Sequence, residues 1–122
     1  MTYPNDRLYS ADHEWMTIDE PIRVGITAFA AAALDEAVYV ELPDVGVEVT
    51  AGEPCGEIES VKSVSDLVAP ASGAVTAIND VVVDDPKLIT DDPHTNWLYE
   101  VNATERGDLM DAEAYQLFIE EL

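Results

Sequence analysis

The sequence is poor in the side chains on which many enzymes depend. Cys55 is the only cysteine, so an internal disulfide is impossible, and a reducing, cytoplasmic location is the simplest expectation. The two histidines, His13 and His94, lie far apart, and neither a Cys pair nor a His-Glu-x-x-His motif is present. The sequence therefore predicts no metal site. It also lacks the Gly-x-Ser-x-Gly motif of many hydrolases, so no catalytic residue is predicted.

Basic residues are also scarce. The chain has 26 acidic and 5 basic residues, which gives a formal net charge of −21. Nucleic acids and anionic membranes are poor partners for such a protein. Two explanations of the acidity stay open: solubility in a salty cytoplasm, or steering toward basic patches on partner proteins.

Long hydrophobic runs are absent as well. No apolar stretch approaches the length of a membrane span, and the first residues lack the basic start and apolar stretch of a secretory signal. With 122 residues, of which 48% are hydrophobic, the chain is long enough to bury one core. We expect a single domain over residues 1–122.

What the chain does contain is a series of short strand-like stretches separated by Gly, Pro and Asp. Apolar residues alternate with other residues in 22–26 and 38–42, which is typical of half-buried strands. Further strands are predicted at 14–18, 53–60, 64–69, 73–78 and 97–102.

The helical signals are short. The alanine-rich segment 27–34 predicts a helix with Thr27 as its N-cap. After Asp111, helical spacing of apolar residues predicts a closing amphipathic helix, and the acidic segment 84–93 is predicted to be a surface loop. Because no long crossover helix separates the central strands, we expect a flattened antiparallel β-sandwich or barrel with small peripheral helices.

Lys62 lies in the middle of the segment 56–70, where two strand-like arms flank a short turn. If the arms pair, Lys62 stands exposed at the tip of a hairpin. Most lysines are solvated surface charges, but this chain has only one other lysine, Lys87. The lysine amine also suits a stable amide link to a carboxylic cofactor such as lipoate or biotin.

The same segment resembles the lipoylation hairpin of the glycine cleavage system H-protein family. The resemblance rests on residues 59–67 followed by 69–73, and it runs along almost the whole chain. Other matching motifs occur in the family's order and at about its spacing: His13-Glu14-Trp15, Arg23 to Thr27, Val38 to Pro43, Val45-Gly46, Asp92-Pro93, Trp97-Leu98 and Asp111 to Tyr115.

This resemblance implies a mainly β fold of the lipoyl- and biotinyl-carrier hybrid-motif type with a C-terminal helix. It implies a non-catalytic, monomeric carrier with lipoate amide-linked to Lys62. Such a carrier takes the aminomethyl group of glycine from a PLP-dependent glycine decarboxylase to a tetrahydrofolate-dependent aminomethyltransferase. It then passes electrons to the FAD enzyme dihydrolipoamide dehydrogenase. A lipoate-attaching enzyme would be a fourth partner.

The resemblance also implies roles for other residues. Glu59, Gly46 and Gly73 match positions to which lipoate-attaching enzymes of the family are sensitive. His13, Glu14 and Asp66 match residues that help to line a cleft for the loaded arm. A plainer interpretation makes Glu14 and Asp66 solvated carboxylates at strand edges and Trp15 part of the core.

Three alternatives to the glycine cleavage role differ in how well they fit. The residues beside Lys62 are Val61 and Ser63, whereas biotin carriers typically have methionines there, so biotin is disfavoured. An H-like protein that relays lipoyl groups to other complexes stays open, because segments 28–31, 34–37 and 94–96 depart from the family's usual pattern. An acidic interaction protein without a cofactor also stays open.

Overall fold

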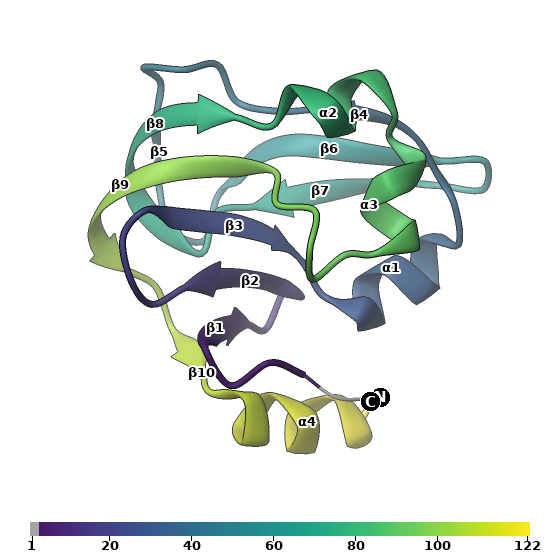
Figure 1. The fold of residues 1–122 in the computed structure, drawn as a ribbon. Coiled ribbons are helices and arrows are strands. Elements are labelled where there is room, and N and C mark those ends of the chain that lie inside the picture. Colours follow the sequence, from purple (N-terminus) through teal and green to yellow (C-terminus); the bar gives the residue numbers. More distant parts are fainter. Residues whose placement is uncertain (1–2) are drawn as a thin grey trace.

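The computed structural model describes residues 3–122 as two antiparallel sheets with small helices around them (Figure 1). The larger sheet has the strand order β10-β1-β2-β3-β9-β8-β5, and the smaller has the order β4-β6-β7. The strands are β1 (Arg7–Ser10), β2 (Glu14–Thr17), β3 (Ile22–Ile26), β4 (Ala37–Glu41), β5 (Glu48–Val49), β6 (Pro54–Ser60), β7 (Val64–Val68), β8 (Ala71–Ile78), β9 (Tyr99–Arg106) and β10 (Leu109–Met110).

The main core lies between the two sheets. Val24 and Val101 of the larger sheet are buried together with Val40, Ile58 and Leu67 of the smaller one. Strands with one buried face and one exposed face bury apolar area with little loss of polar hydration, which is the usual basis of a sandwich. The predicted antiparallel β-sandwich is therefore confirmed. None of the helices among residues 3–122 is long and apolar enough to cross a membrane.

The two helices predicted from the sequence are both present. Helix α1 (Ala28–Leu34) begins after Thr27, whose Oγ1 accepts a hydrogen bond from the backbone N–H of Ala30 at 3.3 Å. Helix α4 (Ala112–Glu120) begins after Asp111, whose carboxylate accepts one from Ala114 N–H at 2.8 Å. Each side chain satisfies a donor that the first turn of a helix leaves free.

The prediction of a loop over residues 84–93 was wrong. Helix α3 (Lys87–Asp91) occupies the middle of this region, and helix α2 (Asp80–Asp84) ends at its first residue. Each buries one fully enclosed apolar side chain, Val82 in α2 and Ile89 in α3, and α3 packs against α1 and β4. Helices of five residues are too short to show a helical period, so the acidic residues around them dominated the pattern.

The predicted strands differ from the observed ones in two places. Val38 is 48% exposed, because a bulge between Ala37 and Tyr39 interrupts the alternation in β4. The predicted strand 97–102 is instead β9, which begins at Tyr99 and continues to Arg106 along β8. Strands β1 and β10 were not predicted.

Two glycines shape the region where β5 meets β8. Gly46 has a φ of +93° in the turn before β5, and its N–H donates to the carbonyl of Val75 at 2.8 Å. At Gly73, opposite Val49, an added Cβ would lie 2.2 Å from the carbonyl oxygen of Asn102. Gly46 is thus required by backbone conformation and Gly73 by close approach of β9.

These geometries predict unequal losses of stability in two alanine variants. Gly73→Ala should lower the free energy of unfolding by about 3 kcal/mol, because backbone atoms of β9 must move. Gly46→Ala should cost only about 1 kcal/mol, since its added Cβ meets nothing within 4 Å and only the positive φ is unfavourable. Chemical denaturation of both variants checks this, and equal losses would contradict it.

Candidate functional site

Lys62 lies at the tip of the hairpin formed by β6 and β7. Figure 1 shows this hairpin projecting from the body of the protein at the right of the view, while α4 lies at the bottom. The last ladder pair is Glu59 opposite Val64, and Val61, Lys62 and Ser63 are all exposed. The predicted position of the lysine, exposed on a structured base, is therefore observed.

Ser60 holds the turn together in place of an Asn-Gly pair. Its Oγ lies 3.3 Å from the backbone N of Lys62 and 3.1 Å from that of Ser63, and it accepts from both N–H groups. The same hydroxyl donates to the carbonyl of Ser63 at 3.2 Å, and the N–H of Ser60 donates to that carbonyl at 2.8 Å. A side chain that satisfies the turn amides removes the need for glycine at positive φ.

The residues predicted to be recognised by an attaching enzyme do not lie together. Glu59, partly exposed, lies on β6 close to the turn. Gly46 and Gly73 lie where β5 meets β8, which Figure 1 shows at the far end of the molecule from the hairpin turn. Of these three residues, only Glu59 is close enough to Lys62 to contact an enzyme that is bound there. The recognition role of all three residues stays a prediction.

Glu14 is buried at the base of the hairpin. Its side chain joins the two sheets: Oε1 accepts from Ser10 Oγ at 2.9 Å, and Oε2 accepts from the N–H of Val68, the last residue of β7, at 3.3 Å. With Glu14 only 2% exposed, loss of water disfavours the charged form and raises the pKa of its carboxyl from 4.5 to about 8. The alternative of a solvated carboxylate is wrong for Glu14.

His13 and Asp66 lie in different surroundings from Glu14. His13 is half-buried, with its Nδ1 2.7 Å from Tyr115 Oη and its ring 4.5 Å from that of Phe29. Burial lowers the pKa of its imidazole. Asp66 is exposed on β7, so the interpretation as a solvated carboxylate fits it. Among residues 3–122, no hydrogen bond or ion pair joins Asp66 to His13 or Glu14.

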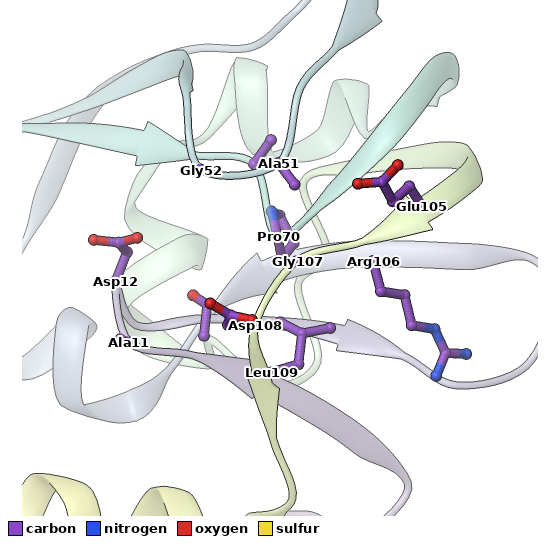
Figure 2. Close-up of a pocket in the computed structure, with 12 residues that line it drawn as sticks. Ala11, Asp12, Ala51, Gly52, Pro70, Glu105, Arg106, Gly107, Asp108 and Leu109 are labelled. Carbon is purple, nitrogen blue, oxygen red and sulfur yellow. The ribbon is translucent and has the colours of Figure 1, made fainter.

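A pocket of about 450 Å³ lies beside the Glu14 site. Ser10, which donates to Glu14, is part of its wall together with Asp12, Pro70 and Asp108. Figure 2 shows the Arg106 side chain pointing away from Asp12 and Asp108. Among residues 3–122, Arg106 is the only basic residue that lines the pocket, and its side chain points away from the acidic walls.

The rest of the site offers little chemistry of its own. Trp15 is 2% exposed and donates from Nε1 to the carbonyl of Pro93 at 3.0 Å, which fits its interpretation as a core residue. Cys55 is partly buried beside Tyr99, and burial raises the pKa of its thiol. Within residues 3–122, no three His, Cys, Asp or Glu side chains are arranged to hold a metal ion.

Two functional residues were missed from the sequence. Ser60 organises the turn and Ser10 supports Glu14. Ser60 is two residues before the lysine, where a side chain commonly bonds to the backbone of a turn, so a local signal existed. Ser10 gave no such signal, because its partner Glu14 is reached only through the pairing of β1 with β2.

Comparison with known proteins points in one direction. The family model described as "Glycine cleavage H-protein" matches residues 7–122. The glycine cleavage system H protein of Corynebacterium jeikeium is 56% identical over 119 residues, which cover 93% of this chain and 94% of that protein. The H protein of Deinococcus radiodurans is 49% identical over 116 residues, covering 94% and 95%.

A solved structure has the same fold. The crystal structure of the glycine cleavage system H protein from Mycobacterium marinum matches with a TM-score of 0.93 at 49% sequence identity. The match covers 98% of this chain and all of that one.

The Ser60 contacts predict that Ser60→Ala loosens the tip of the hairpin. Loss of an acceptor shared by two turn amides should cost about 1 to 2 kcal/mol of stability, and hydrogen exchange at the N–H groups of Lys62 and Ser63 should accelerate. Ser65→Ala, on the same strand as Val64 and exposed, is the matched control and should change neither. Unaltered exchange in Ser60→Ala would mean that the hydroxyl does not hold the turn.

The burial of Glu14 predicts a pH-dependent stability. Between pH 4.5 and pH 8 the folded state keeps a proton that the unfolded state releases. Stability due to this group therefore falls as pH rises, by at most about 1.4 kcal/mol per pH unit. Glu14→Gln keeps the shape without the titration, so the difference between wild type and variant in denaturant unfolding should change across this interval. Parallel curves from pH 5 to pH 8.5 would show that Glu14 is not buried as described.

Proposed function

Because this chain belongs to the glycine cleavage H-protein family and has that family's role in glycine cleavage, we propose that it carries lipoate in amide linkage to Lys62. The observation that supports this proposal most directly is the exposed position of Lys62 at the tip of a tied hairpin. The only other lysine, Lys87, lies in α3 and pairs with Asp91 at 3.0 Å.

Lys62 has the chemistry that the attachment requires. Amide formation needs a primary amine that an enzyme can enclose, and the amine is not committed to an ion pair among residues 3–122. Lipoate supplies a disulfide that opens and closes reversibly. The hairpin presents this lysine to other proteins. Ser60 holds the backbone at the tip, while the lysine side chain stays free to reach several partners.

We infer that His13, Glu14 and Asp66 belong to the cleft in which the loaded arm rests. The support is strongest for Glu14, a carboxyl held out of water and bonded to the base of β7. With 2% of its surface exposed and both oxygens engaged, Glu14 would hold the base of β7 that forms a wall of the cleft, and would not bond to the arm directly. Glu59, Gly46 and Gly73 would serve the attachment step, with Glu59 close to the lysine and the glycines acting through the sheet.

An H protein works with the other components of the glycine cleavage system. The proposed partners are glycine decarboxylase with PLP, aminomethyltransferase with tetrahydrofolate, dihydrolipoamide dehydrogenase with FAD, and the lipoate-attaching enzyme. In this proposal residues 1–122 are one carrier domain, monomeric, cytoplasmic and without catalysis of its own.

The two lysines allow a direct test. After incubation with lipoate, ATP and a lipoate-attaching enzyme, wild-type protein and Lys87→Arg should gain the mass of one lipoyl group. Lys62→Arg should gain none, because a guanidinium does not form this amide. Its thermal unfolding should match wild type, since an exposed tip residue adds little to the core.

Peptide mapping around residue 62 locates the group, and activity of the reconstituted glycine cleavage system tests its use. An unmodified wild type would refute the proposal, as would a fully active Lys62→Arg protein. In protein isolated from its own organism, a mass gain of one biotin on this peptide would instead assign the chain to carboxyl transfer.

A further inference from the structure

The solvent-facing side of the smaller sheet carries an ordered set of acidic residues next to Lys62. Strand pairing sets Glu41 opposite Glu57, and Glu57 opposite Asp66. Glu59 follows two residues after Glu57 on the same face of β6. We call these four residues, with Tyr39 and Val64 beside Glu59, the acidic outer face.

This arrangement is unfavourable for the isolated protein. Like charges directly opposite each other in a sheet repel, and here one row holds three carboxylates across three strands. Among residues 3–122, none of the four carboxylates has an ion pair with a basic side chain. The cation closest in sequence is Lys62 itself. A surface that carries uncompensated repulsion next to a modification site is suited to a cationic partner.

Apolar side chains are exposed on and beside the same face. Tyr39 is 49% exposed, Val64 59% and Val61 81%. Tyr39 and Val64 both flank Glu59 in the strand register, and Val61 precedes Lys62 in the turn. An exposed aromatic residue with apolar neighbours inside a charged rim is the usual composition of a protein-binding surface.

We propose that the acidic outer face is the docking surface for the enzyme that attaches lipoate to Lys62. That enzyme would present arginine or lysine side chains to Glu41, Glu57 and Asp66, and an apolar depression to Tyr39 and Val64. The inference rests on the proposed lipoylation of Lys62. It adds recognition by β4, through Tyr39 and Glu41, to the recognition already expected of Glu59.

The attaching enzyme is the partner that this geometry favours. Before modification the reactive amine extends no further than a lysine side chain, so the enzyme must close over the hairpin tip and touch the adjoining sheet. Enzymes that act on the far end of a lipoyl arm need no such approach. Contact with the face is therefore obligatory only in the attachment step.

The test compares rates of lipoylation of purified variants by the attaching enzyme. In Glu41→Gln/Glu57→Gln two facing carboxylates become amides while Glu59 and Lys62 stay unchanged. The KM for the carrier should rise about threefold to tenfold with kcat nearly constant, and the salt dependence of kcat/KM should decrease. Tyr39→Ser should raise KM in the same range without altering the salt dependence.

A matched control removes the same charge elsewhere. Glu113→Gln/Glu121→Gln changes two exposed carboxylates in and just after α4, which lies at the bottom of Figure 1, away from the smaller sheet, and should leave KM unchanged. Thermal unfolding gives a second readout. The Glu41→Gln/Glu57→Gln protein should be at least as stable as wild type, because the repulsion is relieved. A higher KM therefore reports lost recognition and not lost folding.

Each result separates this inference from the function on which it rests. If wild type is lipoylated and the KM of both outer-face variants is unchanged, docking on this face is refuted while the carrier function stands. If attachment is normal but turnover of the reconstituted glycine cleavage system slows, the face belongs to another component and the inference is wrong. If wild type is never lipoylated, both the proposed function and this inference fail.

Discussion

A carboxyl group held out of water joins the two sheets, and the position of the hairpin depends on it. Strand β7 is the edge of the smaller sheet, so backbone donors on its open side need partners. Glu14 from β2 supplies one by accepting from Val68 N–H, and Ser10 fixes the other oxygen. A charged carboxylate would cost several kcal/mol in this setting, and the rise of its pKa to about 8 shows how that cost is avoided. The base of the hairpin is thereby tied to the larger sheet by a carboxyl group whose burial favours the neutral form.

The sequence is enough to predict those structural features that depend on residues close together in the chain. Alternation of apolar residues is enough to predict β3, the strand-like stretches on both sides of a short turn are enough to predict β6 and β7, and Thr27 before an alanine-rich segment is enough to predict the start of α1. Lys62 could be assigned to the tip for the same reason, since both arms flank it within one short segment. Such local patterns predict the structure correctly because backbone propensity, helix capping and side-chain burial all favour the same conformation.

Features that depend on pairing between distant strands could not be predicted in this way. The burial of Glu14 follows from its contact with Val68, 54 residues later in the chain. The exposure of Val38 follows from a bulge that only the pairing of β4 with β6 produces. Helices α2 and α3 are stabilised mainly by burying Val82 and Ile89 against the rest of the protein, so their short sequences carry little signal of their own. The arrangement of Glu41, Glu57 and Asp66 in one row is likewise a product of register.

Carboxyl groups that repel one another lie where water screens their charges, and the carboxyl group that lies in the interior has a raised pKa. Two carboxylates facing each other about 5 Å apart in a fully solvated sheet repel by less than about 1 kcal/mol, and salt reduces this further. The same two charges in the interior would repel several times more strongly. The like-charged row lies on the exposed face, where its cost is small, whereas the interior position of Glu14 is tolerated by protonation. Solubility alone would be served equally well by carboxylates spread over the surface. Their alignment beside Lys62 exceeds what solubility requires, and a cationic partner at this site is the simplest physical reason for a sheet to retain it.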